Sequence, residues 1–324
     1  MTTASEPRPS APDRSQLSRE LARLLASWRA GDEETLRRRL TELLDGFGEP
    51  ELASFWERVG TTGGSWGHHP PDPVARAISR WVHELVLAPA STLQGAEALE
   101  AARAAPVLLM GNHLSFADLN ILDFMISRTP FRDVADGLSV IVGPKVYADP
   151  LRRLASLCFG TIKTAQSTSR ASGEARMSSR EVARISRRTL HTAHEQMRVG
   201  HPLAVFVEGS RSRSGAMLRT LAAVSRYLER EDALVLPWGI AGSEILMPPG
   251  EDRVTPGRVS VRLGRPIAAA TLRERCAESR RLIMDTVGFL IAALLPAPYR
   301  GMYAKAERKL RAAYQIAREL MPAR

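Results

Sequence analysis

A histidine and an aspartate that could act together follow directly after an apolar run. The run at 106–111 (PVLLMG) leads into the segment 112–118 (NHLSFAD). On a continuous helix the five-residue spacing would place His113 and Asp118 about 140° apart, on different faces. Ser115 and Asp118 fit the S-x-x-D capping pattern, so we expect the helix to start at Ser115 and His113 to lie on the turn before it. There the carboxylate can hold one ring nitrogen, and His113 can act as a general base for a hydroxyl. In the alternative interpretation, Asp118 only completes a capping box and His113 is an ordinary loop histidine.

A second polar segment follows another apolar run, at 202–209. In 206–215 (FVEGSRSRSG), serines and arginines alternate between Gly209 and Gly215. The glycines release the backbone, and backbone N–H groups, hydroxyls and two guanidinium groups could then hold a phosphate. The spacing is not that of a P-loop. The alternative is a solvated basic turn.

The order of apolar runs and helical patterns predicts what positions these two segments. Helical spacing of leucines marks the first hundred residues, with Asp32 and Asp72 as expected helix caps. From about residue 105 the chain alternates strands and helices, which favours an α/β fold in which both polar segments meet at one edge of a sheet. The expected strands are 106–111, 139–143, 202–209, 234–240 and 258–264, and the expected helices lie near 116–127, 149–157, 178–199 and 216–229. The last fifty residues return to helix. For the stretch 282–303, both a core helix and an element at a membrane interface remain open.

Together and in this order, the two segments resemble motifs of the phospholipid/glycerol acyltransferase family, which includes the glycerol-3-phosphate and 1-acylglycerol-3-phosphate O-acyltransferases. The first motif of that family, N-H-x-S-x-x-D, is matched in full from Asn112 to Asp118. The third, F-P-E-G-T-R-S-R, is similar to 206–213, with Val207 in place of Pro and Ser210 in place of Thr.

Two further stretches extend the resemblance to roughly residues 100–270. The run ending at Pro237 resembles the fourth motif, and 261–267 is similar to the closing strand of the family's domain. The resemblance implies an acyltransferase-type mixed sheet flanked by helices, preceded by a small N-terminal helical bundle. We therefore expect a disordered tail at 1–15, a helical bundle at 16–95, an acyltransferase catalytic domain at 96–270 and C-terminal helices packing on it at 271–324.

The resemblance also implies an activity: transfer of a fatty acyl group from acyl-CoA or acyl-carrier protein to a hydroxyl of a glycerophosphate or lysophospholipid, in phospholipid biosynthesis. His113 would be the general base, and Asp118 would hold its imidazole. The implied substrate-binding residues are Glu208, Gly209, Ser210, Arg211, Arg213 and Lys163, and the implied supporting residues are Asn112, Ser115 and Pro237. No metal is expected, and no cofactor besides the thioester co-substrate.

The second motif of the family, near G-x-x-F-I-x-R, is where the chain departs from the pattern. The corresponding stretch, 160–166, has Ala165 and Gln166 where an arginine is expected. Lys163 and Arg170 lie nearby and could substitute. The departure leaves open an acceptor other than glycerol phosphate or lysophosphatidate.

Composition indicates an anionic partner. The chain has 45 Lys and Arg against 35 Asp and Glu, a net charge of +10, and all but four of the basic residues are arginines. Guanidinium groups suit phosphate, so we expect an anionic membrane surface as a partner. No nucleic acid is expected, because no basic segment is interleaved with aromatics.

The remaining features indicate where the chain works. Two cysteines cannot supply a disulfide framework, and the longest apolar stretch near the end, 286–299, is too short to span a bilayer. The expected location is cytoplasmic, peripheral on the inner face of the cell membrane. Three alternatives to the glycerolipid enzyme stay open: an acyltransferase for a non-glycerophosphate lipid, a basic membrane- or nucleic-acid-binding protein without catalysis, and a hydrolase in which His113 activates water.

Overall fold

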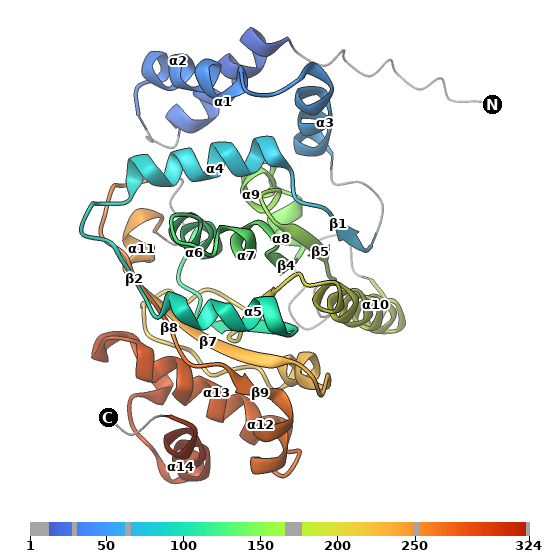
Figure 1. The fold of residues 1–324 in the computed structure, drawn as a ribbon, viewed down its shortest axis with the longest axis vertical. Helices are drawn as coiled ribbons and strands as arrows, with labels where there is room; N and C mark the ends of the chain where they lie inside the picture. Colours follow the sequence, from blue (N-terminus) through green and yellow to red (C-terminus); the bar gives the residue numbers. More distant parts are fainter. Residues whose placement is uncertain (1–12, 28–30, 62–65, 166–176, 249–252, 322–324) are drawn as a thin grey trace, which may run out of the picture.

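One mixed β-sheet forms the centre of the computed structural model, which describes residues 13–27, 31–61, 66–165, 177–248 and 253–321 (Figure 1). The described strands are β1 (His68–His69), β2 (Thr92–Gln94), β3 (Val107–Gly111), β4 (Ser139–Val142), β5 (Gly160–Lys163), β6 (Leu203–Phe206), β7 (Leu234–Ala241), β8 (Ser260–Leu263) and β9 (Ile267–Ala268). Their order is β1-β5-β4-β6-β3-β7-β8-β2, and β9 pairs with β7. Neighbours from β5 to β7 are parallel, whereas β8 is antiparallel to β7. The expected α/β fold with a mixed sheet is confirmed.

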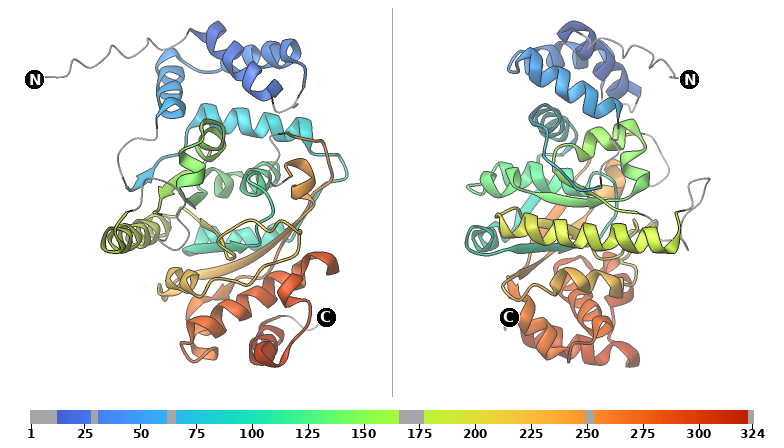
Figure 2. Two further views of the ribbon diagram at one scale, coloured as in Figure 1. Left: turned by 180° about the vertical axis from the view of Figure 1, so that it is seen from behind. Right: turned by 90° about the vertical axis from the view of Figure 1, so that its right-hand side faces the viewer.

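Helices cover both faces of this sheet (Figure 2). The longer described helices are α1 (Arg14–Ser27), α2 (Glu33–Leu44), α3 (Glu49–Gly60), α4 (Pro73–Val86), α6 (Asp118–Ser127), α9 (Pro150–Ser156), α10 (Ser179–Arg198), α12 (Ala269–Arg275), α13 (Arg280–Leu294) and α14 (Arg311–Leu320). Shorter elements are α5 (Ala101–Ala104), α7 (Arg132–Asp136), α8 (Pro144–Tyr147), α11 (Ser243–Leu246) and the 3-10 helices η1 (Ala96–Glu100), η2 (Ala222–Leu228), η3 (Ala297–Tyr299), η4 (Gly301–Tyr303) and η5 (Arg308–Leu310).

Alternation along β3 separates two apolar cores. Val107 and Leu109 belong to one core with α4, α6 and α9, whereas Leu108 and Met110 belong to the other with α10, α13 and α14. Because successive side chains of a strand point to opposite faces, a fully apolar strand can hold a layer of helices on each side. β3 is therefore anchored from both faces, and its carboxyl end is a fixed platform.

The N-terminal helices form where leucine spacing and caps predict them. Leu17, Leu21 and Leu25 are buried on one side of α1. The Asp32 carboxylate accepts the Thr35 N–H at 2.9 Å and caps α2, as expected. The cap expected at Asp72 is also present, since its carboxylate accepts two N–H groups in the first turn of α4. The expected tail lies outside the described residues up to residue 12, and α1 already begins at Arg14.

The prediction of an α-helix near 216–229 is wrong. Only the 3-10 turn η2 forms there, and the residues before it run as a loop. The backbone N–H groups that a helix would use are taken elsewhere, because Leu218 donates to the Glu208 carboxylate and Leu221 donates to the Val207 carbonyl. These contacts between distant residues hold the loop against the sheet edge.

The C-terminal helix α13 is part of the core. Ten of its residues are buried, in an unbroken run from Ile283 to Ala292. Of the two expectations for 282–303, a core helix or an element at a membrane interface, this burial supports the core helix. In the described part of the chain, no helix combines the length and the apolarity that a membrane span requires.

Candidate active site

The loop between β3 and α6 brings His113 against Asp118. His113 Nδ1 lies 2.8 Å from Asp118 Oδ2, and His113 is outside the helix, as expected. The expectation that the helix starts at Ser115 is wrong, because α6 begins at Asp118. The hydrogen bonds of the S-x-x-D capping pattern are nevertheless present, because the Asp118 carboxylate accepts the Ser115 N–H at 3.0 Å and the Ser115 hydroxyl accepts the Ala117 N–H at 3.1 Å. The carboxylate also accepts the Leu114 N–H.

Asp118 is fully buried and is fixed by donors on both of its oxygens. Besides His113, Oδ2 accepts the Leu114 N–H at 2.7 Å. Oδ1 accepts the hydroxyl of Ser115 at 3.0 Å and that of Ser243 at 2.6 Å. We infer from these bonds that His113 carries its proton on Nδ1, which leaves a lone pair on Nε2. Ser243 was missed by sequence reasoning, although it directly follows β7 and a glycine, a place where a polar side chain could have been noticed.

The imidazole of His113 packs against an aromatic side chain. Its ring is stacked on Phe206, with centroids 3.9 Å apart and an angle of 18° between the planes. The side chain is 15% exposed. Nε2 makes no hydrogen bond with any residue that the structure describes. The ring is therefore held by Asp118 and Phe206, and Nε2 remains available to accept a proton.

The neighbouring residues lock β3 to β7. The Asn112 side chain donates to the Ile240 carbonyl and accepts the Ile240 N–H, both at 2.9 Å. A Cβ at Gly111 would lie 2.3 Å from the Trp238 ring, so only glycine fits there. Pro237 pairs in register with Met110 of β3 inside β7. Asn112 and Pro237 thus belong to the support of the loop.

Glu208 joins the second polar segment to the first. Its Oε1 accepts the His113 N–H at 2.9 Å, and its Oε2 accepts the Leu218 N–H at 2.6 Å. Burial raises the pKa of Glu208 to about 7, against the opposing effect of these two N–H groups, and Asp118 raises it further. Ser212 also donates its N–H to the His113 carbonyl at 2.8 Å. The two segments meet at the sheet edge, as the sequence predicts.

The rest of the second segment lies around the mouth of the site. Gly209 has φ 65°, which only glycine adopts without strain, and Gly209, Ser210 and Arg213 are exposed. Arg211 is partly buried, and its Cζ lies 3.6 Å from the centre of the Phe116 ring. Sequence reasoning missed Arg152 of α9, whose Cζ lies 4.4 Å from the same ring centre.

Lys163 lies in a different place. It is buried at the end of β5 and lines a polar cavity with Arg153, Tyr147 and Thr161. Burial lowers the pKa of Lys163, and Arg153 lowers it further. The residues that line this cavity do not include His113 or Arg211. Gln166 and Arg170 lie outside the described residues.

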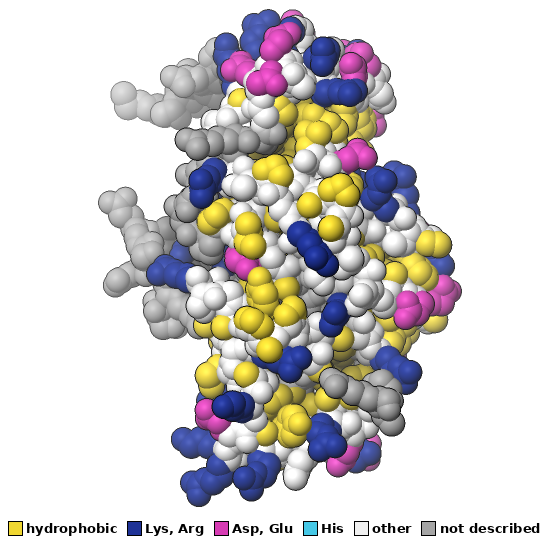
Figure 3. All heavy atoms as spheres, turned by 90° about the vertical axis from the view of Figure 1, so that its left-hand side faces the viewer, with side chains coloured by type: hydrophobic (Ala, Val, Ile, Leu, Met, Phe, Trp, Pro, Cys, Tyr) yellow, Lys and Arg dark blue, Asp and Glu magenta, His cyan; other side chains and the backbone are white. Residues whose placement is uncertain are grey.

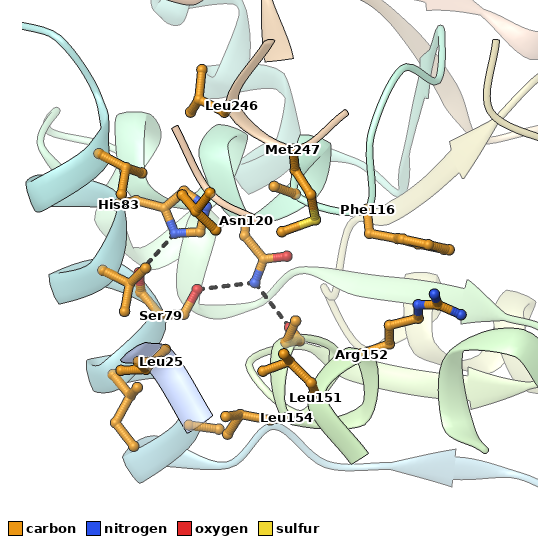
Figure 4. A pocket seen from close by; sticks show the side chains of 17 residues that line it. Leu25, Ser79, His83, Phe116, Asn120, Leu151, Arg152, Leu154, Leu246 and Met247 are labelled. Atoms are coloured by element: carbon orange, nitrogen blue, oxygen red, sulfur yellow. Dashed lines mark hydrogen bonds between the residues drawn. The ribbon is translucent and has the colours of Figure 1, made fainter. Parts of the chain in front are cut away.

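An apolar cavity begins beside the loop that carries His113 (Figure 4). It holds about 790 Å³ of space, part of it open to solvent, and its walls come from α1, α4, α6, α9, α11 and the loop before α6. Phe116 and Arg152 lie at one end, and Leu25 and His83 lie toward the other. Burial lowers the pKa of His83 to about 4, so this side chain is neutral near pH 7 and adds no charge to the cavity.

Comparisons with known proteins were made by sequence and by structure. No protein-family model matches the chain, and no curated protein matches its sequence. Among solved structures, the chain is similar to the 1-acyl-sn-glycerophosphate (LPA) acyltransferase PlsC from Thermotoga maritima. That alignment has 15% sequence identity and a TM-score of 0.48, and it covers 85% of this chain and 93% of the other.

Proposed function

We propose that the chain is an O-acyltransferase of the phospholipid/glycerol acyltransferase family. It would move a fatty acyl group from a thioester, acyl-CoA or acyl-carrier protein, to a hydroxyl of a glycerophosphate or lysophospholipid in phospholipid biosynthesis. The observation that carries the proposal is the 2.8 Å contact between His113 Nδ1 and Asp118 Oδ2. Because Nδ1 makes this contact, Nε2 of the same ring is available to act as the base.

The proposed step needs no covalent acyl-enzyme. Nε2 of His113 takes the proton of the acceptor hydroxyl while the oxygen attacks the thioester carbonyl carbon. The new C–O bond forms, the C–S bond breaks, and the imidazolium returns the proton to the leaving thiolate. Asp118 stabilises the positive charge that His113 carries in between, as the aspartate does in a Ser-His-Asp triad.

The apolar cavity supports a long acyl chain as the transferred group. Phe116 and Ala117 belong both to the catalytic loop and to the cavity wall. An alkyl chain placed there leaves water and gains about 0.8 kcal/mol for each buried CH₂ group. The acyl carbonyl at the mouth of the cavity would then lie beside His113.

The polar side of the mouth supports an anionic acceptor. Arg211 and Arg213 follow Glu208 on the loop that bonds to His113. One guanidinium group can donate two parallel hydrogen bonds to two oxygens of a phosphate. Ser210 is exposed on the same loop and can add a hydroxyl donor. A phosphate held there would bring a neighbouring hydroxyl toward Nε2.

We further propose that the protein works in the cytoplasm at the inner face of the cell membrane, where it meets lipid substrates. Large apolar side chains are exposed at Leu85, Ile245 and Met302. Figure 3 shows hydrophobic side chains interspersed with Lys and Arg on the side where Figure 1 places α11 and β2. A surface of this kind suits an anionic lipid headgroup layer.

The test is thioester consumption with identification of the product. Purified full chain and His113→Ala are given acyl-CoA or acyl-carrier protein, with glycerol 3-phosphate, lysophosphatidate or a non-phosphorylated lysolipid. A His113-dependent ester product supports the proposal, and the preferred acceptor names the substrate. Free fatty acid as the sole product would show a hydrolase. A folded chain that binds anionic vesicles or nucleic acid but turns over no thioester would contradict catalysis.

A further inference from the structure

Two arginines from distant parts of the chain share one aromatic ring at the mouth of the site. Arg152 comes from α9 and Arg211 from the loop after β6, and both guanidinium groups lie against Phe116. Their Cζ atoms lie 4.4 Å and 3.6 Å from the ring centre. Cation–π contact with Phe116 positions both groups, but it neutralises neither charge.

Neither guanidinium group is in an ion pair with a carboxylate of the described residues. In the described part of the chain, Arg152 donates from Nη1 only to the Lys145 carbonyl, at 3.3 Å, and neither Arg152 nor Arg211 forms an ion pair. Burial lowers the pKa of Arg211, and the like charges of Arg152 and Arg213 lower it further, against the opposing attraction of Asp118. An anion between the guanidinium groups would offset both costs.

The next residue shows that this arrangement is specific to Arg152. Arg153 is buried and donates to the backbone carbonyls of Tyr147 and Val59 at 2.8 Å and 2.5 Å. Its guanidinium is therefore used in joining α9 to its neighbours. Arg152 instead turns to Phe116, at the end of the apolar cavity that adjoins the catalytic loop (Figure 4).

The distance to the reacting centre follows from the chain itself. Phe116 is three residues after His113 on one short loop, and Ser212, next to Arg211, donates its N–H to the His113 carbonyl. A group bound by the arginines therefore lies beside the loop that carries His113.

We propose that Arg152 and Arg211 together bind a substrate phosphate beside His113, with Arg152 supplying the cation that the chain lacks at Ala165 and Gln166. Which substrate carries the phosphate rests on the proposed function: it is the phosphate of a glycerophosphate acceptor or that of the phosphopantetheine arm of the donor. Both are phosphate esters, and a planar guanidinium fork bonds two oxygens of either.

Binding without turnover tests the assignment. Isothermal titration calorimetry of the full chain would use sn-glycerol 3-phosphate and 4′-phosphopantetheine, with glycerol and pantetheine as phosphate-free counterparts. Arg152→Gln should weaken binding of the phosphorylated probe about tenfold to a hundredfold, as expected for the loss of hydrogen bonds to a charged group. Arg152→Lys keeps the charge but loses the planar guanidinium group. Its affinity for the phosphorylated probe should lie between those of the unchanged chain and Arg152→Gln.

A matched control removes the same charge elsewhere. Arg311 is exposed on α14, which lies at the far end of the molecule from α9 in Figure 1, so Arg311→Gln should bind like the unchanged chain. Equal binding by the unchanged chain and Arg152→Gln, or no preference for a phosphorylated probe in the unchanged chain, would overturn the inference. The probe that depends on Arg152 identifies the source of the phosphate.

The experiment separates this inference from the proposed reaction. If the chain transfers acyl groups but binds phosphate independently of Arg152, only the assignment of Arg152 fails. If phosphate binding depends on Arg152 but no thioester is consumed, only the reaction fails. In an active enzyme, Arg152→Gln should raise KM for the phosphorylated substrate, whereas Arg311→Gln should leave both KM and kcat unchanged.

Discussion

Asp118→Asn distinguishes two ways in which the carboxylate could serve His113. The substitution keeps the shape and removes the charge, and its effect depends on which position the amide nitrogen takes. At the Oδ2 position the nitrogen would face the Leu114 N–H at 2.7 Å, donor against donor. At the Oδ1 position it would face the hydroxyls of Ser115 and Ser243, which can turn to accept. The Ser115 N–H also points to Oδ1, but it lies equally 3.0 Å from Oδ2 and can keep that bond. We therefore expect the nitrogen at the Oδ1 position, with the carbonyl oxygen still facing His113 Nδ1.

This orientation sets the magnitude of the loss. The proton stays on Nδ1, so Nε2 keeps its lone pair and remains a base. What is lost is the extra strength of a hydrogen bond to a charged partner when His113 becomes positive, about 1–2 kcal/mol. That corresponds to a roughly 5- to 30-fold lower kcat. A flipped amide would instead hold the wrong tautomer, for which the loss in a serine protease triad is about 10⁴-fold.

The assay is kcat for thioester consumption at saturating donor and acceptor, with His113→Ala as the baseline that lacks the base. Asp118→Asn should stay at least about threefold above His113→Ala, whose loss should reach ~10²–10⁴-fold. Ser243→Ala keeps the charge and should cost less than about tenfold, the value of one hydrogen bond. If Asp118→Asn falls to the level of His113→Ala while its thermal unfolding remains cooperative, the reasoning from the two hydroxyls is refuted.

Three further predictions concern the support of the site. Burial raises the pKa of Glu208 to about 7, so the protonated side chain stabilises the folded state. This contribution to the free energy of unfolding, on the order of 3 kcal/mol, is complete below pH ~4.5 and is lost as pH rises to ~7. Denaturant unfolding across this range should lose that slope in Glu208→Gln. Gly111→Ala forces a Cβ against Trp238 and should lower the unfolding free energy by at least ~1–3 kcal/mol in the same assay. Asn112→Ala leaves two buried groups of β7 unpaired and should cost ~2–4 kcal/mol, with an unchanged midpoint as the contrary result.

Features that depend on neighbours in sequence could be predicted. The caps at Asp32 and Asp72 and the buried leucines of α1 follow from side chains within one or two turns. The strand before Asn112 follows from an apolar run that ends at a glycine. In each case the deciding interactions lie within a few residues of one another, so the local pattern contains the information.

Features that depend on residues far apart in the sequence could not be predicted from it. Ser243 is 125 residues from Asp118, and its bond depends on how β7 lies beside β3. The missing helix near 216–229 has the same origin, because the Glu208 carboxylate and the Val207 carbonyl accept N–H groups that a helix would need. The helical pattern was present in the sequence, but tertiary hydrogen bonds outweighed it.

Arg152 shows why a motif can be incomplete in sequence and complete in space. A basic residue was expected at Ala165, on the strand-to-loop segment after β5, because a motif assigns a side chain to a position in the chain. A phosphate, however, responds to the position of the charge and not to the segment that carries it. From α9, Arg152 reaches the ring of Phe116 beside Arg211.

The two buried carboxylates of the site have different tasks. Asp118 binds donors of its own loop and one hydroxyl from α11, so it fixes the ring of His113 within the first segment. Glu208 instead joins the His113 N–H to the Leu218 N–H and so spans the two segments. Since Arg211 lies on the loop that Glu208 anchors, a phosphate that shifts this loop must also shift the backbone of His113. Binding of the anion and placement of the base are therefore coupled through Glu208, and Glu208→Gln should raise KM for a phosphorylated acceptor and lower kcat together. A change confined to KM would contradict this coupling.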